Sequence, residues 1–413
     1  MLNWVNRFNI CAFLDNHHYD SDVSGPECLV GAGVEHFLSA EAGTAFSQLQ
    51  KFHEQHYDWI FGHLSYDLKN ESEKLYSKLP DHIGFSDLFF FIPQVVLLLS
   101  KDQLLIGVDK DHERIFAEIN QTKTKQTKTN ETVLNILQRF NKAEYMQSVA
   151  LIKEHIHAGD CYELNFCQEF YVEEVVIEPM HTYLQLSKTS PNPFSAFYKL
   201  DGRFVICASP ERYLRNKGGI LLSQPIKGTK ARESREFDID ESERTQLLTS
   251  EKDRSENVMI VDLVRNDLSR VCEKGTVEVK ELFGIYTFPH VHQMISSVTG
   301  KLRKNTTVEE ILRATFPMGS MTGAPKKKVL ELIEQFEKTK RGIFSGSIGY
   351  MTPEGDFDFN VVIRSVMYNQ QSGYLSFQTG SAITFYSDPE EEYNECLLKA
   401  AAIKKVLTKV NTF

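Results

Sequence analysis

Hydrophobic and polar positions fall into short β-like runs and a few longer helical repeats. Aromatic and β-branched runs predict strands at 95–99, 104–108, 204–207, 342–350, 357–366 and 374–378. Apolar residues at helical spacing predict helices over 141–159, from Pro325 onward, and from about 391 to 407. Because the strands cluster instead of alternating strictly with helices, we expect an α+β fold with antiparallel sheets and helices packed outside.

One compositional break divides the chain. Residues 121–131 contain no apolar side chain and show no periodicity, which is typical of a surface loop or flexible connection. We therefore distinguish an N-terminal region (1–120), a polar connection with its lead-in (121–139) and a main region (140–413).

Composition and charge narrow the classes of function. The chain has 413 residues, 41% of them hydrophobic, as in ordinary globular proteins. Its formal charge of -10 argues against nucleic-acid binding, so an anionic substrate needs local basic groups or a metal ion. The longest apolar run, 88–99, is interrupted and too short to span a membrane. With no secretory segment and seven scattered cysteines, we expect a cytoplasmic protein with reduced thiols and no zinc site.

A single lysine stands in an unusual setting. Lys227 follows a predicted strand at 219–222 and lies between Pro225 and Gly228, so a tight turn should direct its side chain into a cleft. Partial desolvation would lower its pKa and leave some free amine, which a nucleophile needs. The alternative is a solvated lysine in a loop.

Five motifs occur in order along the chain. They are Ser-Pro-Glu-Arg (209–212), Pro-Ile-Lys-Gly-Thr (225–229), Glu-Asn-Val-Met-Ile-Val-Asp-Leu-Val-Arg-Asn-Asp (256–267), Gly-Ser-Met-Thr-Gly-Ala-Pro-Lys (319–326) and Gln-Thr-Gly-Ser (378–381). With these motifs the chain resembles the chorismate-utilising enzymes over roughly residues 140–408. That family includes anthranilate synthase component I, aminodeoxychorismate synthase component I, and the isochorismate and salicylate synthases. The resemblance implies two stacked antiparallel β-sheets with helices outside, an N-terminal region in the same fold, and a chorismate-binding catalytic region at 140–413.

The lysine selects a branch of this family. Pro-Ile-Lys-Gly-Thr is similar to aminodeoxychorismate synthases, whereas anthranilate synthases usually carry alanine in place of Lys227. The resemblance implies that chorismate and ammonia become 4-amino-4-deoxychorismate, for para-aminobenzoate and folate synthesis. Lys227 would attack C2, and Glu211 would protonate the departing C4 hydroxyl. A Glu211–Lys227 salt bridge that only supports the fold is the alternative for this pair.

Other functions stay open at this point. They are anthranilate or isochorismate synthesis, and a non-catalytic regulatory subunit that binds chorismate or an amino acid. No cysteine lies in a Gly-x-Cys-x-Gly elbow, so we expect a separate glutamine amidotransferase to supply ammonia.

Glutamates on two predicted helices match the magnesium-binding positions of the family. They are Glu256 and Glu395, and Glu392 could bind the ion through water. Mg²⁺ commonly binds one or two protein carboxylates together with substrate oxygens, and chorismate is a dicarboxylate. Asp267 is a weaker candidate, which we expect to pair with Arg265 or Arg270 or to support the fold.

Further positions match substrate contacts in the family. The loop at 319–326 lacks the spacing of a nucleotide P-loop but leads into a helix N-terminus that favours a carboxylate. Arg364 interrupts an apolar strand and needs an anionic partner, whereas Lys399 could simply pair with Glu395 along one helix. A turn at 380–381 should expose backbone donors. The expected substrate-binding residues are Gly228, Thr229, Ser320, Thr322, Tyr350, Arg364, Gly380, Ser381 and Lys399.

Three positions depart from the family patterns. Ala382 replaces a glycine common at the end of the Gly-x-Gly turn. Gln293 and Asn257 stand where anthranilate synthases carry histidines, and His292 lies beside Gln293. The two missing histidines and the presence of Lys227 point away from anthranilate formation.

Overall fold

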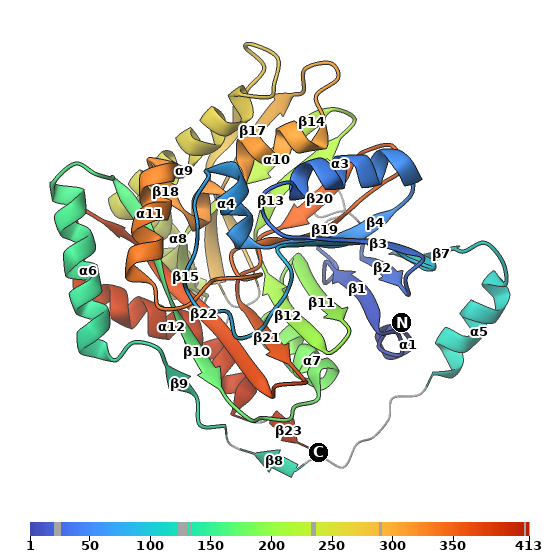
Figure 1. The fold of residues 1–413 in the computed structure, drawn as a ribbon. Coiled ribbons are helices and arrows are strands. Elements are labelled where there is room, and N and C mark those ends of the chain that lie inside the picture. The colour runs from blue at the N-terminus through green and yellow to red at the C-terminus, as the bar shows by residue number, and fades with distance from the viewer. Residues whose placement is uncertain are drawn as a thin grey trace.

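The computed structural model describes residues 1–19, 26–122, 130–132, 134–232, 237–288, 291–408 and 410–412. Two large antiparallel sheets stack against each other, and helices cover their outer faces (Figure 1). This arrangement confirms the predicted α+β fold.

The larger sheet, sheet A, has the strand order β18-β10-β22-β21-β12-β11-β1-β2-β6-β7, and β9 pairs with β10. Its strands are β1 (Ile10–Asp15), β2 (Cys28–Ala32), β6 (Val95–Ser100), β7 (Gln103–Gly107), β9 (Leu137–Gln138), β10 (Glu163–Val172), β11 (Phe194–Leu200), β12 (Arg203–Ser209), β18 (Gly323–Ala324), β21 (Ser365–Asn369) and β22 (Tyr374–Thr384).

The smaller sheet, sheet B, has the order β15-β17-β14-β13-β20-β19-β4-β5-β3, and β16 pairs with β17. Its strands are β3 (His36–Ala40), β4 (Ile60–Leu64), β5 (Leu88–Ile92), β13 (Arg212–Lys217), β14 (Ile220–Gln224), β15 (Ile226–Ala231), β16 (Glu278–Thr287), β17 (Val291–Lys301), β19 (Ser347–Met351) and β20 (Phe357–Asn360). Two further strands, β8 (Asn130–Thr132) and β23 (Val410–Thr412), pair with each other.

The helices pack around these sheets. They are α1 (Leu2–Val5), α3 (Ala45–His56), α4 (Lys69–Ser72), α5 (His112–Gln121), α6 (Lys142–His157), α7 (Pro179–Thr189), α8 (Phe237–Thr249), α9 (Glu251–Ser269), α10 (Val308–Thr315), α11 (Lys326–Phe336) and α12 (Pro389–Leu407), with short 3₁₀ turns η1 (Tyr66–Leu68) and η2 (Gly319–Met321). The predicted capping box of α6 is present, since Asn141 and Glu144 bond reciprocally across its first turn.

The N-terminal region supplies strands to both sheets. The apolar run 88–99 forms β5 in sheet B and then β6 in sheet A. Pro93 and Gln94 separate the two strands, because proline cannot continue a hydrogen-bonded ladder. Within the predicted polar connection (121–139), residues 123–129 and 133 lie outside the described residues.

Strand alternation creates two layers of hydrophobic core. On β11 and β12, Tyr198 and Val205 belong to the cluster between the sheets, whereas Phe197 and Ile206 belong to a second cluster. Helices α6, α7, α11 and α12 cover that second cluster on the outer face of sheet A. This period-two pattern follows from side chains pointing to opposite faces of a strand.

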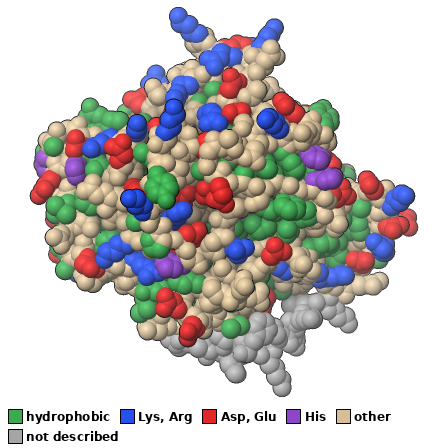
Figure 2. Space-filling model, viewed as in Figure 1, with side chains coloured by type: hydrophobic (Ala, Val, Ile, Leu, Met, Phe, Trp, Pro, Cys, Tyr) green, Lys and Arg blue, Asp and Glu red, His purple; other side chains and the backbone are tan. Residues whose placement is uncertain are grey.

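The surface carries mixed charge. Basic and acidic side chains are interspersed over the face seen in Figure 2. All seven cysteines are free and buried. None of the described helices combines the length and apolar character needed to cross a bilayer.

Candidate active site

Two segments that cross between the sheets bring the Glu211 carboxyl and the Arg364 guanidinium into one site. Residues 210–211 lead from β12 in sheet A to β13 in sheet B, and residues 361–364 lead back from β20 to β21. The Val361 amide donates to the Glu211 carbonyl at 3.0 Å, and the Ala208 amide donates to the Arg364 carbonyl at 3.3 Å. These bonds hold the two crossings side by side, so Glu211 and Arg364 belong to one site.

The single strand predicted over 357–366 was therefore wrong. The chain changes sheets after Asn360, and Arg364 has a φ of 51° just before β21 begins. This left-handed conformation is uncommon for a residue with a side chain and is frequent at functional sites. The apolar alternation on both sides of the crossing hid the break from the sequence pattern.

Burial gives Glu211 the character of an acid. Its side chain is nearly inaccessible, and burial raises its pKa to about 7, against the opposing effects of Ser320, Lys227 and Arg364. Burial lowers the pKa of Arg364, while the nearby Glu211 carboxylate raises it. The Glu211 carboxyl can thus carry a proton near neutral pH, as a general acid must.

A β-bulge directs Lys227. The register between β15 and β17 shifts between Ile226 and Thr229, and Gly228 within this bulge has a φ of 89°. A side chain at Gly228 would be strained in that conformation and would press on Leu247 and Asp253. Bulges commonly re-aim a side chain. Here Lys227 is only 10% exposed, and its Nζ lies 2.6 Å from Glu163 Oε1.

One alternative and one expectation for Lys227 were wrong. Its ion-pair partner is Glu163, not Glu211. Burial acts to lower the pKa of Lys227, as expected, but the carboxylates of Glu163, Glu256 and Glu211 outweigh it and hold the pKa above its ordinary value. The resting side chain is therefore an ammonium ion, because the site is more acidic than the local sequence indicates.

Glu163 was not identified from the sequence. It begins β10 and is 1% exposed, and its Oε2 has no hydrogen-bond partner among the described residues. Its neighbour β18 approaches closely, because a Cβ on Gly323 would lie 2.1 Å from the Glu163 carbonyl oxygen. The feature that could have identified it is a glutamate at the start of a strand, 163–172, that is almost entirely buried.

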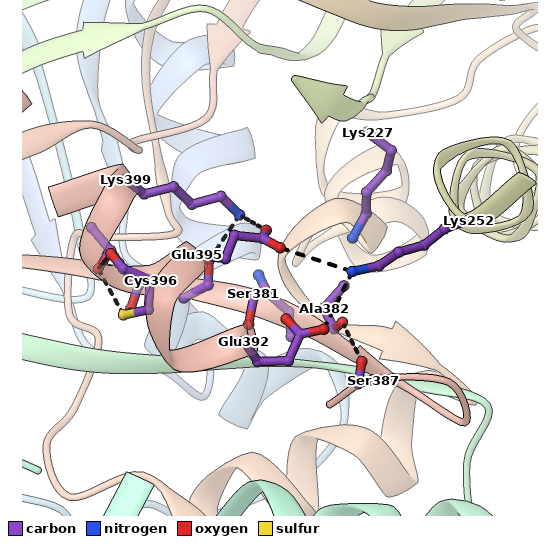
Figure 3. A network of polar contacts seen from close by, with 12 residues as sticks. Lys227, Lys252, Ser381, Ala382, Ser387, Glu392, Glu395, Cys396 and Lys399 are labelled. Carbon is purple, nitrogen blue, oxygen red and sulfur yellow. Dashed lines mark hydrogen bonds and ion pairs between the residues drawn. The ribbon is translucent and has the colours of Figure 1, made fainter. Parts of the chain in front are cut away.

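A second acidic group lies between α9 and α12 (Figure 3). Glu392 is 1% exposed, and Lys252 Nζ lies 3.4 Å from its Oε1 and 3.9 Å from Glu395 Oε2. Glu256, on α9, is 8% exposed, and burial raises its pKa to about 7. Burial acts to lower the pKa of Lys252, yet Glu392, Glu256 and Glu395 raise it above its ordinary value. Lys252, which was not predicted, is thus a cation on which all three carboxylates act.

These carboxylates fit a magnesium ion on chemical grounds. Glu256 Oε1 and Glu392 Oε2 are buried and have no partner among the described residues, and such atoms are costly unless a ligand satisfies them. In the described part of the chain, no three acidic, histidine or cysteine side chains are grouped closely enough to hold a metal alone. Mg²⁺ does not require that, since it often takes one or two protein carboxylates and completes its shell with water and substrate.

Comparison with known proteins places this site in a family. The family model described as chorismate binding enzyme matches residues 17–405. The chain belongs to the chorismate-binding enzyme family. It is 42% identical to a probable chloroplastic aminodeoxychorismate synthase of Oryza sativa over 65% of this chain, and spans 31% of that relative's length. It is 39% identical to aminodeoxychorismate synthase component 1 of Klebsiella aerogenes, over 64% of this chain and 58% of the relative.

Other members of the family are similar over more of the chain. An anthranilate synthase component I-like protein of Synechocystis is 34% identical over 85% of this chain and 73% of its own length. The crystal structure of anthranilate synthase component I from Streptococcus pneumoniae superposes with a TM-score of 0.75 at 27% identity, covering 84% of this chain and 80% of that one. The fold is thus that of the chorismate-binding enzymes.

Among the other predicted substrate-binding residues, Ser320 lies beside Glu211, whereas Thr322 and Lys399 are engaged in other contacts. The Ser320 hydroxyl is buried next to the Glu211 carboxyl and acts to lower its pKa. Thr322 Oγ1 instead donates within its own loop, at 3.2 Å to the Met318 and Gly319 carbonyls. Lys399 Nζ pairs with Glu395 at 2.8 Å and donates to the Gly380 carbonyl at 3.0 Å, so the intrahelical pair considered for it is present.

The turn predicted at 380–381 is not formed. Strand β22 continues through Gly380 and Ser381 to Thr384, paired with β10. A Cβ on Gly380 would lie 2.1 Å from the Phe166 carbonyl oxygen, so close strand pairing explains this glycine. On its other edge, β22 pairs with β21 only at Tyr374–Ser376. No strand lies beside 380–382 on that edge within the described residues.

Tyr350 and Thr229 were also predicted to bind substrate beside Lys227. Tyr350 is on β19, separated from β15 by β17, β14, β13 and β20, and its ring stacks on Trp59 at 5.7 Å. Thr229 is exposed on β15. The structure therefore does not bring Tyr350 to Lys227, and Thr229, two residues after Lys227 on the same strand, faces solvent.

Asp267, Gln293 and its neighbour His292 lie elsewhere in the structure. Asp267 pairs with Lys326 at 2.6 Å, so the expected arginine partner was wrong and this pair supports the loop before α11. The buried Gln293 amide has no partner among the described residues. His292 is held by Asp240 at 2.9 Å and Thr287 at 3.0 Å, which ties β17 to α8.

Proposed function

We propose that this protein converts chorismate and ammonia to 4-amino-4-deoxychorismate, the amination step that precedes para-aminobenzoate in folate synthesis. One observation carries the proposal: the buried Lys227 lies next to carboxylates, of which Glu211 has a pKa raised to about 7. A lysine nucleophile and a protonated acid in one site fit a substitution through a covalent intermediate. The relatives named aminodeoxychorismate synthase support the same reaction.

The covalent step balances as follows. Nζ of the neutral Lys227 amine forms a bond to C2, the two conjugated ring double bonds shift from C1=C2 and C5=C6 to C1=C6 and C4=C5, and the C4–O bond breaks. The hydroxyl leaves as water with the proton of Glu211. Ammonia then adds at C4, both double bonds shift back to C1=C2 and C5=C6, and the C2–N bond breaks to release the lysine amine. The new C4 ammonium returns a proton to the Glu211 carboxylate.

The remaining residues would bind and orient the substrate. Arg364 and the Ser320 hydroxyl would be donors for a chorismate carboxylate, since both lie next to Glu211. Glu256 and Glu395 would hold Mg²⁺, and Glu392, whose Oε2 has no partner among the described residues, would bind it through water. A bound Mg²⁺ would offset the charge of these acids and attract the second substrate carboxylate.

The source of ammonia is a separate question. None of the seven cysteines, all buried and free, stands in the elbow motif of a glutaminase. We therefore propose that a glutamine amidotransferase partner delivers ammonia to this chain, and that ammonium salts replace the partner in vitro. Glutamine-driven turnover by the isolated chain would contradict this part of the proposal.

Product identification tests the function. The purified chain, incubated with chorismate, Mg²⁺ and ammonium with or without an added lyase, should form aminodeoxychorismate, detected by chromatography and mass spectrometry. Anthranilate is an ortho-amino aromatic with strong fluorescence, and isochorismate forms without ammonia. Either one as the main product would replace the proposal, and chorismate binding without turnover would indicate a regulatory subunit.

A further inference from the structure

We propose that Glu163 is a catalytic residue that holds the amine of Lys227 and accepts its proton before the amine attacks the substrate. This inference rests on the proposed function, because it concerns how the same nucleophile becomes competent. Nothing in the family motifs of this sequence pointed to Glu163, and its role follows from contacts in the structure.

The first argument is geometric. Lys227 Nζ and Glu163 Oε1 are 2.6 Å apart, a distance at which a proton can pass directly between them. The two residues come from opposite sheets, since β15 lies at the edge of sheet B and β10 lies next to the edge of sheet A. This contact fixes the lysine amine at the place where the two sheet edges meet.

One carboxylate oxygen of Glu163 is an unpaired hydrogen-bond acceptor. Its Oε1 binds Lys227, while Oε2 is buried and has no hydrogen-bond partner among the described residues. A carboxylate that served only as a structural counter-ion would normally have both oxygens satisfied at this depth. An unpartnered oxygen leaves the group able to take up a proton or to accept an N–H group of incoming ammonia.

Lys227 must lose a proton before its amine can attack the substrate. The resting Lys227 is an ammonium ion among Glu163, Glu211 and Glu256, and an ammonium cannot attack C2. Glu395 on α12 also acts electrostatically on Lys227, while Lys252 on α9 and Arg364 in the crossing segment act on the neighbouring Glu256 and Glu211. Lys252 and Arg364 are cations, and Glu211 must keep its own proton for the leaving hydroxyl. Glu163 is the carboxylate within hydrogen-bond distance of the amine.

The proton inventory closes over a full turnover. Glu163 takes one proton from Lys227, and the neutral amine forms the bond to C2. When ammonia has added at C4, the lysine leaves as a neutral amine and recovers that proton from Glu163. The net reaction consumes chorismate and ammonia and releases aminodeoxychorismate and water, with both glutamates restored.

Glu163→Gln tests the role, because glutamine keeps the shape and can hydrogen-bond Lys227 but cannot accept its proton. We expect kcat at pH 7 to fall about 10²-fold or more, with KM for chorismate within a few-fold of wild type. Without this carboxylate the pKa of Lys227 should come down, so the deficit should shrink as the pH is raised to about 9–10. Glu169→Gln is the matched control, since Glu169 is a buried acid on the same strand that pairs with Arg139 outside the site. It should retain kcat within a few-fold.

A second readout separates this inference from the proposed function. Rapid-quench mass spectrometry without ammonia should detect a dehydrated chorismate adduct on Lys227, formed slowly in Glu163→Gln and at the wild-type rate in Glu169→Gln. No adduct and no aminodeoxychorismate from the wild type would refute the proposed function. A wild type that forms both, with Glu163→Gln equally fast, would overturn only the role of Glu163. A loss that is the same at every pH would also overturn it, because that result indicates a structural pair.

Discussion

Two buried ion pairs attached to the same strand, β10, have opposite character. In the Glu337–Arg341 pair, both side chains are fully hydrogen-bonded. Glu337 accepts from the Cys167 amide at 2.9 Å and from Arg341 at 2.6 Å, and Arg341 also donates to the Asn165 carbonyl at 2.7 Å. The Lys227–Glu163 pair is open, since one Glu163 oxygen has no partner among the described residues. Burial alone therefore does not mark the site.

Unsatisfied atoms distinguish the two regions. The Glu337–Arg341 pair joins α11 and the chain after it to β10, and through the Met321 carbonyl, at 2.6 Å, to the 3₁₀ turn η2. Such a fully hydrogen-bonded pair maintains structure. Glu163, Glu256 and Glu392 each have a buried carboxylate oxygen without a hydrogen-bond partner among the described residues, which remains available to a ligand. Buried ionisable groups in such settings cluster at functional sites. The comparison predicts that mutations in the first region affect stability and those in the second affect turnover.

The largest expected effect is on turnover at Lys227. Lys227→Ala should lower the rate of aminodeoxychorismate formation by about 10³-fold or more, because the nucleophile is removed. Chorismate affinity, measured by calorimetry, should stay within a few-fold. Lys227→Arg should not restore turnover, since a guanidinium stays protonated. Near wild-type turnover by the alanine variant would leave Lys227 as a binding residue only.

The second prediction concerns the Glu337–Arg341 pair. Arg341→Met should reduce the free energy of unfolding by about 3–5 kcal/mol, because it leaves Glu337 buried without its counter-charge. Urea denaturation would measure this loss. Glu163→Gln should reduce stability much less, since Lys227 keeps Glu256 and Glu211 nearby. Equal losses in the two variants would remove the distinction between the regions.

Metal removal gives the third effect. EDTA should abolish turnover, and Glu256→Gln or Glu395→Gln should lower it by about 10²-fold or more through lost charge stabilisation. Glu391→Gln is a matched control, because Glu391 is an exposed acid on the same helix as Glu392. Its turnover should equal that of the wild type. Full activity in metal-free buffer would contradict the magnesium site.

The sequence predicted the fold class and several residues of the candidate site, but not the links between the sheets. Periodicity located α6, α12 and many strands because local burial patterns determine them. It joined 357–366 into one strand, since both halves are apolar and only the tertiary fold shows that the chain changes sheets at Asn360. Motifs identified Lys227 and Glu211. Glu163 and Lys252 were missed because their roles depend on partners 64 and 140 residues away, a relation that no local pattern contains.

The smallest effect is a pH dependence of stability carried by Glu211. Its pKa is raised from 4.5 to about 7 in the folded protein, so the folded state binds this proton more tightly than the unfolded state does. The resulting contribution to stability is complete below pH 4.5 and is lost as the pH rises through about 7. Glu211→Gln cannot ionise and should lose less stability over that interval than the wild type, as measured by urea denaturation from pH 4.5 to 8. The Glu391→Gln control should follow the wild type throughout. Parallel curves for wild type and Glu211→Gln would show that Glu211 is already ionised in the folded protein, and the acid assigned to the departing hydroxyl would have to be another group.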